Sequence, residues 1–369
     1  MRTFVKASAP AAARTLEGAA YTSADVYERE RRRIFSRSWV CAGRSTQIAA
    51  PGAFITMTVA GESLILTRDT DGAAHAFYNV CRHRGTRLCQ DDAGTFKGSI
   101  QCPYHAWTYG LDGCLVAARN MDDVPGFDRG AYPLHEAALT ERDGFIFVAL
   151  DPHVPFDSLF EPLRERIAAW NPGSLRSARR IEYALACNWK LVFQNYSECY
   201  HCPVIHPQLE KLSPWDSGLN DFVEGPILGG YSTLRDETAT LTASGRTARG
   251  PLPGVTGENR SRVYYYTVFP SLLLSLHPDY VMAHYVTPVD AAATRVVCEW
   301  LFDENAMHEP DFDASDAIAF WDETNRQDWR VNELTQLGVT SRAYTPGPYS
   351  QAEGLLHAFD RHYRSVMSE

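Results

Sequence analysis

The chain has 369 residues, of which 45% are hydrophobic and 22% charged, a length and composition that allow two globular domains with sizeable cores. Its formal net charge of −10 argues against a nucleic-acid partner, because a basic face would be needed to neutralise phosphates. The sequence has no run of about 18 apolar residues, so we expect no membrane span.

Residues 1–39 predict a helical lead-in that packs on a later domain. Thr22 and Ser23 offer a hydroxyl cap and Asp25 an acid in the first turn, and the helix is expected to reach about Ser38.

Residues 40–150 predict a compact all-β domain. Short apolar runs alternate with turn residues, as at Phe54–Val59 and Phe145–Leu150. Three Asp-Gly pairs are hairpin-type turn signals: Asp71-Gly72, Asp112-Gly113 and Asp143-Gly144.

Residues 151–369 predict an α+β domain with an antiparallel sheet covered by helices. Strands are expected from Ile181 to Phe302, with loops at Gly229-Gly230 and at Ser244–Gly257. A helix is expected over Trp189–Tyr200, a long one over Asp313–Leu337, and a last one over Gln351–Met367. No Gly-x-Gly-x-x-Gly follows a strand, so a flavin or nicotinamide domain is not expected.

The nine cysteines favour thiolate ligands and buried thiols over a disulfide framework. This usage is typical of a reducing compartment, and we expect a cytoplasmic protein. Four cysteines are interpreted as ordinary small core residues: Cys89, Cys114, Cys187 and Cys298.

Two Cys/His pairs in the β domain predict a metal cluster. Cys81 and His83 form the first pair and Cys102 and His105 the second, with 18 residues between the pairs. Two thiolates and two imidazoles suit either a structural zinc or a Rieske [2Fe–2S] centre, in which histidines replace two cysteines on one iron. Cys-Arg-His-Arg-Gly and Cys-Pro-Tyr-His-Ala-Trp resemble the Rieske signature, and we favour that interpretation.

A second candidate site lies in the segment 194–206. Glu198 and His201 are three residues apart and would share a face of a helix. His206 is off that face, and Pro203 predicts that the helix ends or deforms so that His206 can return. A further carboxylate must come from the long helix, where spacing does not choose among Asp313, Asp316, Asp322, Glu323, Asp328 and Glu333.

Taken together, the motifs resemble the catalytic (alpha) subunit of the Rieske non-heme iron oxygenases, the ring-hydroxylating oxygenase family. The resemblance covers nearly the whole chain. It implies that His201, His206 and Asp328 hold mononuclear Fe(II), with Asp322 as the fallback third ligand. It also implies that Glu198, where the family usually has aspartate, is no ligand but bridges His201 to a Rieske histidine of the neighbouring subunit. Glu-Cys-Tyr-His-Cys-Pro and His-Pro-Gln-Leu resemble the branch that contains glycine betaine, carnitine and stachydrine oxygenases.

The family resemblance further implies a terminal oxygenase. Electrons from NAD(P)H would arrive through a separate reductase, with a ferredoxin as an optional carrier, and O2 would be the co-substrate. The family is typically a homotrimer, sometimes with a second, small subunit.

The substrate is a small molecule that the sequence does not identify. Six residues of the sheet and the long helix are expected to wall its pocket: Tyr264, Tyr266, Phe269, His277, Tyr285 and Trp321. The aromatic ones could hold a quaternary ammonium by cation–π attraction, which predicts N-methyl hydroxylation and release of formaldehyde. The alternatives are hydroxylation or dihydroxylation of an aromatic ring, an electron-transfer protein without oxygenase activity, and a zinc-structured binding module.

Overall fold

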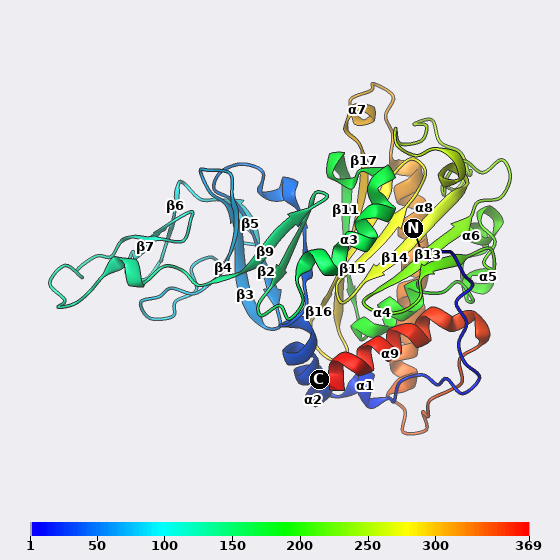
Figure 1. Ribbon diagram of the computed structural model, residues 1–369, viewed down its shortest axis with the longest axis horizontal. Coiled ribbons are helices and arrows are strands. Elements are labelled where there is room, and N and C mark those ends of the chain that lie inside the picture. The colour runs from blue at the N-terminus through cyan, green and yellow to red at the C-terminus, as the bar shows by residue number, and fades with distance from the viewer. Residues whose placement is uncertain (1, 369) are drawn as a thin grey trace. The chain divides into compact units, whose positions relative to one another are not determined.

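A computed structural model describes residues 2–368, and the chain divides into two compact units. The small unit comprises residues 34–156, and the large unit comprises residues 2–33 and 157–368. Both are built on antiparallel sheets, so the expected α+β fold is confirmed (Figure 1).

The small unit contains a seven-stranded sheet in the order β1-β10-β9-β4-β3-β2-β5 and a three-stranded sheet β6-β7-β8. Every pair of neighbouring strands is antiparallel. The strands are β1 (Val40–Arg44), β2 (Ala53–Val59), β3 (Glu62–Arg68), β4 (Ala74–Tyr78), β5 (Ala93–Thr95), β6 (Ser99–Gln101), β7 (Thr108–Gly110), β8 (Leu115–Ala117), β9 (Glu136–Arg142) and β10 (Phe145–Ala149). Short 3-10 helices cover Ser45–Ile48 and Arg129–Ala131.

The turn chemistry of the small unit follows the sequence at the Asp-Gly pairs. Asp143 and Gly144 both have positive φ, of 50° and 78°, as a two-residue turn between β9 and β10 requires. The hairpin β2–β3 turns in the same way at Ala60 and Gly61, although alanine is a weak signal for positive φ.

The large unit contains the second seven-stranded sheet, in the order β11-β17-β16-β15-β14-β13-β12. Its strands are β11 (Leu175–Leu185), β12 (Leu219–Phe222), β13 (Ile227–Thr233), β14 (Arg262–Val268), β15 (Leu272–Leu276), β16 (Val281–Pro288) and β17 (Thr294–Asp303). Its helices are α1 (Ala19–Thr22), α2 (Ala24–Glu30), α3 (Phe156–Ile167), α4 (Trp189–Tyr196), α5 (Cys202–Ile205), α6 (Pro207–Leu212), α7 (Glu304–Met307), α8 (Ser315–Val339) and α9 (Gly354–Ser368), and α2 continues as a π-helical turn over Arg31–Phe35. Shorter 3-10 helices cover Ala168–Trp170, Pro172–Ser174, Gly257–Ser261 and Gln351–Glu353.

The helices α4, α8 and α9 pack together with the sheet of the large unit. Helix α8 contacts β11 and α4, α4 contacts β16, and α9 contacts β13. Figure 1 shows α4 and α9 running beside this sheet. The segment that follows α4 contacts α8 through Asp328.

The loop predicted at Gly229-Gly230 is wrong, because both glycines lie inside β13. They are needed for close approach of neighbouring strands. A Cβ on Gly229 would come within 2.0 Å of the Tyr265 carbonyl oxygen, and one on Gly230 within 2.0 Å of the Leu219 carbonyl oxygen.

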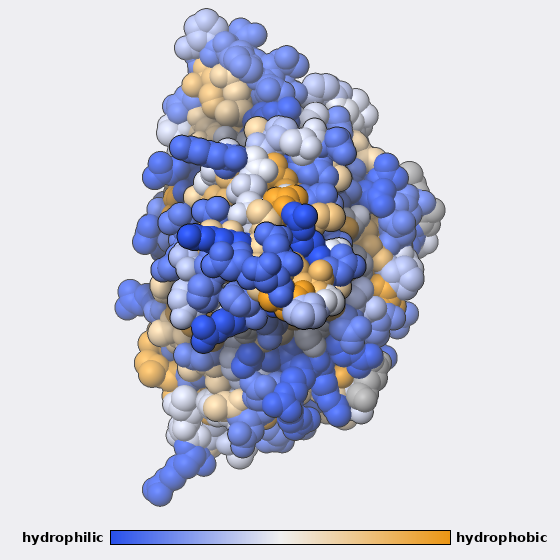
Figure 2. All heavy atoms as spheres, turned by 90° about the vertical axis from the view of Figure 1, so that its left-hand side faces the viewer, coloured by the Kyte–Doolittle hydropathy of each residue, from blue (hydrophilic) through white to orange (hydrophobic). Residues whose placement is uncertain are grey.

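Among the described residues, no helix is both long and apolar enough to cross a membrane. On the face drawn in Figure 2, hydrophilic side chains predominate and the hydrophobic areas between them are small.

A fully buried ion pair fixes the start of α4. Lys190 Nζ lies 2.5 Å from Glu30 Oε1, and both side chains are completely excluded from solvent. Trp189 Nε1 and the Tyr363 hydroxyl also donate to Glu30, so its carboxylate joins α2, α4 and α9. Burial lowers the pKa of Lys190 against the attraction of Glu30.

Replacing Lys190 by Met leaves the Glu30 charge buried without its cation, and we expect the free energy of unfolding to fall by about 3–5 kcal/mol. The double variant K190M/E30Q removes both charges and should recover most of that loss, while K211M at an exposed lysine should change little. Urea unfolding of the three variants measures the effect. A single variant as stable as the wild type would contradict it.

Candidate metal centres and substrate cavity

Two loops of the small unit repeat the same hydrogen bonds around their cysteines. Cys81 N donates to Thr86 O at 2.8 Å, and Cys102 N donates to Trp107 O at 2.8 Å. Four residues after each cysteine, the amide of Gly85 or Ala106 donates back to the cysteine carbonyl, and both of these residues have positive φ. The equivalent turns present one sulfur and one imidazole from each loop.

The side chains on these loops fit a [2Fe–2S] cluster. Cys81 and Cys102 are buried, and the rings of His83 and His105 lie 4.8 Å apart. The Nδ1 atoms of both histidines are buried and have no hydrogen-bond partner among the described residues, although a buried polar atom normally has one. Two unpartnered imidazole nitrogens beside two buried thiols are the donor set of a Rieske centre.

Neighbouring side chains support this arrangement. Trp107 stacks on His83 with the rings 4.8 Å apart and 7° from parallel. The Tyr109 hydroxyl lies 3.3 Å from Cys81 Sγ and accepts a hydrogen bond from Arg82 N. Hydrogen bonds to the sulfur ligands and solvent exclusion are two factors that set the potential of an iron–sulfur cluster.

In the large unit, the helix predicted over Trp189–Tyr200 ends at Tyr196. Glu198 and His201 therefore lie in a turn and not on one helical face as predicted. One carboxylate oxygen of Glu198 instead accepts hydrogen bonds from the amides of Tyr200 and His201, which closes this turn. Pro203 lies in the first turn of the short helix α5, where proline is tolerated, and α5 brings His206 back towards His201.

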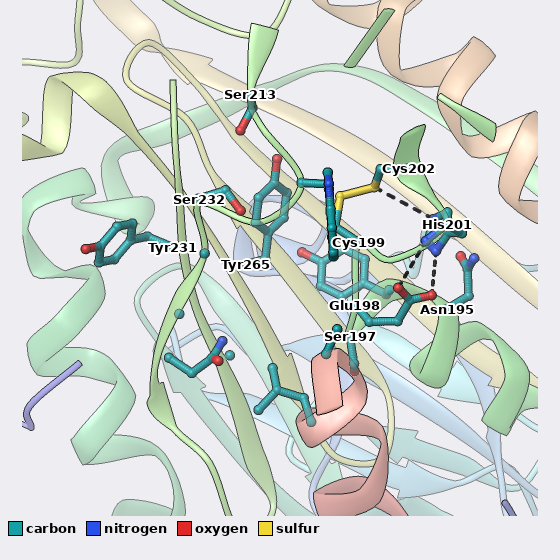
Figure 3. A pocket seen from close by; sticks show the side chains of 18 of the residues that line it. Asn195, Ser197, Glu198, Cys199, His201, Cys202, Ser213, Tyr231, Ser232 and Tyr265 are labelled. Atoms are coloured by element: carbon teal, nitrogen blue, oxygen red, sulfur yellow. Dashed lines mark hydrogen bonds and ion pairs between the residues drawn. A yellow bond between two sulfur atoms is a disulfide. The ribbon is translucent and has the colours of Figure 1, made fainter. Parts of the chain in front are cut away.

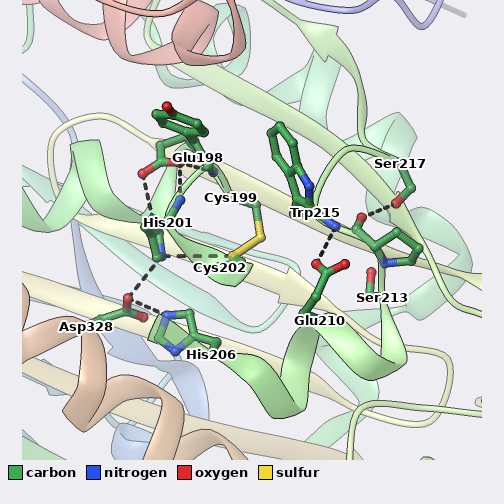
Figure 4. Close-up of a disulfide and its surroundings, with 12 residues drawn as sticks. Glu198, Cys199, His201, Cys202, His206, Glu210, Ser213, Trp215, Ser217 and Asp328 are labelled. Carbon is green, nitrogen blue, oxygen red and sulfur yellow. Dashed lines mark hydrogen bonds and ion pairs between the residues drawn. A yellow bond between two sulfur atoms is a disulfide. The ribbon is translucent and has the colours of Figure 1, made fainter. Parts of the chain in front are cut away.

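His201, His206 and Asp328 converge, as Figure 4 shows. Asp328 Oδ1 lies 3.3 Å from His201 Nε2 and 2.8 Å from His206 Nε2. One ligand atom from each of the three residues lies within 4.8 Å of the other two. Two imidazoles and one carboxylate are a donor set for iron that leaves coordination positions open.

The other acids of the long helix have different partners. Asp322 accepts a hydrogen bond from the Tyr183 hydroxyl at 2.6 Å and pairs with Arg326. Asp316 pairs with Arg249, and Glu333 accepts from Ala186 N. Of the carboxylates considered from the sequence, Asp328 is the one that the structure brings to both histidines, and the fallback Asp322 is engaged elsewhere.

The outer ring nitrogens of both histidines are also held. His201 Nδ1 lies 2.6 Å from Glu198 Oε1, and His206 Nδ1 lies 2.7 Å from Gln327 Oε1. Each carboxyl or amide oxygen accepts the Nδ1 proton and so turns Nε2 towards Asp328. Sequence reasoning missed Gln327, whose only signal is its place directly before Asp328.

The charges of this site favour a cation. Burial opposes a charged imidazole, but the carboxylates of Asp328 and Glu198 outweigh it and raise the pKa of His201 to about 10. Burial likewise opposes a charged Asp328, yet the two imidazoles lower the pKa of its carboxyl to about 2. A bound divalent metal would take the place of the proton on His201.

A cavity of about 150 Å³ adjoins the three converging side chains. Five aromatic residues line it: Tyr196, Trp215, Tyr231, Tyr265 and Trp321. In Figure 3, Tyr265 lies between the strand that carries Tyr231 and Ser232 and the segment that carries Glu198 and His201.

The predicted pocket walls are mostly wrong. Of the six residues, only Trp321 lines the cavity. Side chains alternate between the faces of a strand, so when Tyr265 of β14 faces the cavity, Tyr264 and Tyr266 point to the opposite face. There Tyr266 donates a hydrogen bond to Asp221. His277 is fully buried against Tyr280, and Tyr285 donates to Glu299.

Two interpretations of the cysteines need correction. Cys199 and Cys202 form a disulfide beside His201, which the sequence did not predict (Figure 4). The tight turn closed by Glu198 brings the two sulfurs together. Cys114 is exposed and not a core residue, whereas Cys89, Cys187 and Cys298 are buried as predicted.

Comparison with known proteins agrees with this geometry. Residues 172–369 match the family described as "Ring hydroxylating alpha subunit (catalytic domain)", and residues 38–128 match the "Rieske [2Fe-2S] domain". The chain is 31% identical to the glycine betaine monooxygenase oxygenase subunit of Pseudomonas aeruginosa, over 90% of this chain and 83% of that protein. It is also 31% identical to the carnitine monooxygenase oxygenase subunit of Acinetobacter baumannii, over 88% and 85% of the two chains.

A solved structure is similar over almost its whole length. The quaternary ammonium Rieske monooxygenase CntA in complex with its substrate L-carnitine matches with a TM-score of 0.81 and 28% identity. The match covers 98% of this chain and 97% of that chain.

The disulfide closes a loop of four residues, for which loop-closure entropy gives a stabilisation of roughly 2 kcal/mol. We expect the double variant C199S/C202S to lose about this much unfolding free energy, measured by urea unfolding under non-reducing conditions. Added dithiothreitol should destabilise the wild type but not the variant, and C114S should behave as the wild type. Equal sensitivity of wild type and variant to dithiothreitol would contradict the prediction.

Proposed function

Because the chain belongs to the ring-hydroxylating oxygenase alpha-subunit family and carries a Rieske [2Fe–2S] domain, we propose that it hydroxylates an N-methyl group of a small quaternary ammonium compound. The chain is an oxidoreductase, so the electron-transfer and zinc-module alternatives are set aside. The observation that carries the proposal is the aromatic lining of the cavity beside His201, His206 and Asp328.

The proposed cofactor residues are those that the sequence singled out. Two cysteines and two histidines of the small unit would hold the cluster: Cys81, His83, Cys102 and His105. His201, His206 and Asp328 would hold the mononuclear iron, and the support for this is the convergence of His201 Nε2, His206 Nε2 and an Asp328 oxygen. When bound, the two iron centres supply electron storage and activation of O2.

The chain's own residues would orient and separate the reactants. Glu198 and Gln327 hold the Nδ1 protons of the two histidines, so that both Nε2 atoms face the same point. The three protein ligands would come from the segment after α4 and from α8, which leaves the cavity side open. A substrate bound in the cavity would therefore lie beside the metal.

The cavity chemistry suits a quaternary ammonium. Such a cation cannot donate hydrogen bonds, and aromatic faces attract it through their electron-rich rings. Five aromatic residues line the cavity, while its two acids, Glu198 and Asp328, already contact histidines. Hydroxylation of one N-methyl group by O2, two electrons and two protons would give an N-hydroxymethyl ammonium and water. This product would break down to formaldehyde, a tertiary amine and a proton.

The polar side chains of the cavity argue against an aromatic hydrocarbon as the substrate. An aromatic hydrocarbon would need a largely apolar cavity. Among the described lining residues are polar groups from Asn195, Ser197, Ser213, Asn220, Ser232, Thr267 and Thr324.

The family works with a reductase, and we propose that electrons reach this chain from a flavin or iron–sulfur reductase, with or without a ferredoxin. We further propose a homotrimer in which Glu198 links His201 to a Rieske histidine of the neighbouring subunit. Inter-subunit electron transfer is described for CntA. Tyr200 and Val204 near His201 and Tyr104 next to His105 are exposed, so these surfaces are accessible to a neighbouring subunit.

We also propose limits for the domains of the chain and a cytoplasmic location for the protein. We assign residues 40–150 to the Rieske domain, residues 151–369 to the catalytic domain, and residues 1–39 to a lead-in packed on the latter. The compactness of residues 34–156 supports a Rieske unit close to these limits, with residues 34–39 and 151–156 on its side. The buried contacts of Tyr21 and Glu30 with Gln194 and Lys190 support the packing of the lead-in on the catalytic domain. The seven free cysteines support a cytoplasmic location, and the Cys199–Cys202 disulfide departs from that pattern.

Anaerobic purification followed by iron and sulfide analysis tests the proposed cofactors. We expect a red-brown protein with about three irons and two acid-labile sulfides per chain, as one [2Fe–2S] cluster and one mononuclear iron require. With a surrogate reductase and O2, betaines and carnitine should yield formaldehyde and aromatic acids should not. Two irons per chain, or no formaldehyde from any quaternary ammonium, would contradict the corresponding part of the proposal.

Replacing Glu198 by Gln should leave both metal sites filled and slow turnover by roughly 100-fold, because the amide neither bridges as an anion nor holds the His201 proton as firmly. The rate of cluster reoxidation in a single turnover with substrate and O2 measures the electron transfer directly. The control E182Q changes an exposed glutamate of β11 and should have no effect. A near-normal reoxidation rate in E198Q would refute the bridging role.

A further inference from the structure

The N-terminal segment is anchored at the edge of the large sheet, next to the cavity. Val5 and Asn220 of β12 exchange backbone hydrogen bonds of 2.8 and 2.7 Å, and Ala7 N donates to the Asn220 side chain. Phe4 packs edge-to-face on Tyr231, with the ring centroids 4.7 Å apart. These contacts on both sides of residue 6 fix the position of that residue.

Lys6 lines the cavity, and its ammonium group is oriented by backbone carbonyls. Nζ donates to Asp216 O at 2.8 Å and to Gly218 O at 3.2 Å. A lysine ammonium has three donors, so one remains after these two bonds. Among residues 2–368, no carboxylate lies within ion-pair distance of Lys6. The lysine therefore presents an uncompensated positive charge at a fixed place.

This charge is unusual in its surroundings. Of the described residues that line the cavity, Lys6 is the one lysine or arginine. Glu198 and Asp328 are the lining acids, and both contact the histidines of the metal site. A substrate that carried only a positive charge would bind more tightly without Lys6, because like charges repel.

We propose that Lys6 binds the carboxylate of the substrate. The inference rests on the proposed function and narrows it. The substrate would be a betaine that carries a trimethylammonium group for the aromatic side chains and a carboxylate for Lys6. A quaternary ammonium alcohol such as choline lacks the second group and would bind more weakly.

The alternative is that Lys6 only fastens the segment around Asp216 and Gly218. That role would affect every ligand of the cavity alike, whereas a carboxylate site discriminates between a carboxylate and an amide of the same shape. Matched ligand pairs therefore separate the two roles.

The test measures binding of such pairs to the iron-loaded enzyme by calorimetry. The pairs are glycine betaine with its carboxamide, γ-butyrobetaine with its carboxamide, and benzoate with benzamide. We compare the wild type with K6Q, which removes the charge, with K6R, which keeps it, and with K211Q, which removes an exposed lysine outside the cavity.

In the wild type, the carboxylate should bind about two- to fivefold more tightly than its carboxamide, the range expected for an exposed ion pair. K6Q should abolish this preference with little change in carboxamide binding, K6R should retain it, and added salt should weaken it. K6Q should also raise KM for substrates that carry a carboxylate, with kcat nearly unchanged.

Equal binding of carboxylate and carboxamide to the wild type, or equal losses of both in K6Q, would overturn the inference. The proposed function is scored separately by formaldehyde release. If betaines release formaldehyde with the same KM in K6Q, the proposed function stands and the Lys6 site falls. If Lys6 discriminates only benzoate from benzamide and no betaine is turned over, the carboxylate site stands and the quaternary ammonium proposal falls.

Discussion

The contact on which the catalytic unit depends is the Asp328 carboxylate between two imidazoles. One oxygen lies 3.3 Å from His201 Nε2 and 2.8 Å from His206 Nε2, and so α8 is tied to a segment more than a hundred residues earlier in the chain. Without a metal, burial opposes a charged His201, but the carboxylates of Asp328 and Glu198 outweigh it and raise its pKa to about 10, so the imidazole holds a second proton at neutral pH. The arrangement is thus electrostatically prepared for a metal before one binds.

The surroundings keep this contact in register. Upstream, Gln194 on α4 donates to Asp360 of α9 and exchanges hydrogen bonds with Tyr21. Downstream, the turn at 197–201 is closed by the Glu198 carboxylate and by the Cys199–Cys202 disulfide. Breaking the hydrogen bonds of Gln194 or Glu198 would leave buried polar groups without partners, which costs free energy. Together with the disulfide, these hydrogen bonds therefore restrict where His201 and His206 can lie. In the small unit, two loops with the same hydrogen bonds each present one cysteine and one histidine, so the ligand positions are set by local turns.

The sequence predicted the parts of the site that are local, and failed where long-range packing decides. Cys81, His83, Cys102 and His105 carry their spacing in the sequence, and the structure gives both pairs equivalent loops. Asp328 could be selected from six acids on or just before α8 only through the family resemblance, because spacing alone does not say which face of α8 meets the histidines. Tyr265 was missed in favour of its neighbours since a shift of one residue exchanges the faces of a strand. Lys6 had no sequence signal and Gln327 had only its place directly before Asp328, because the partners of both residues lie far away in the chain.

Iron-edge anomalous diffraction from crystals of the anaerobically purified protein tests the central claim most directly. The account predicts one strong feature of two irons enclosed by Cys81, His83, Cys102 and His105, and a separate single iron bound by His201, His206 and Asp328. A second feature bound by Asp322, or no iron between His201 and His206 in a protein that releases formaldehyde from a betaine, would contradict it.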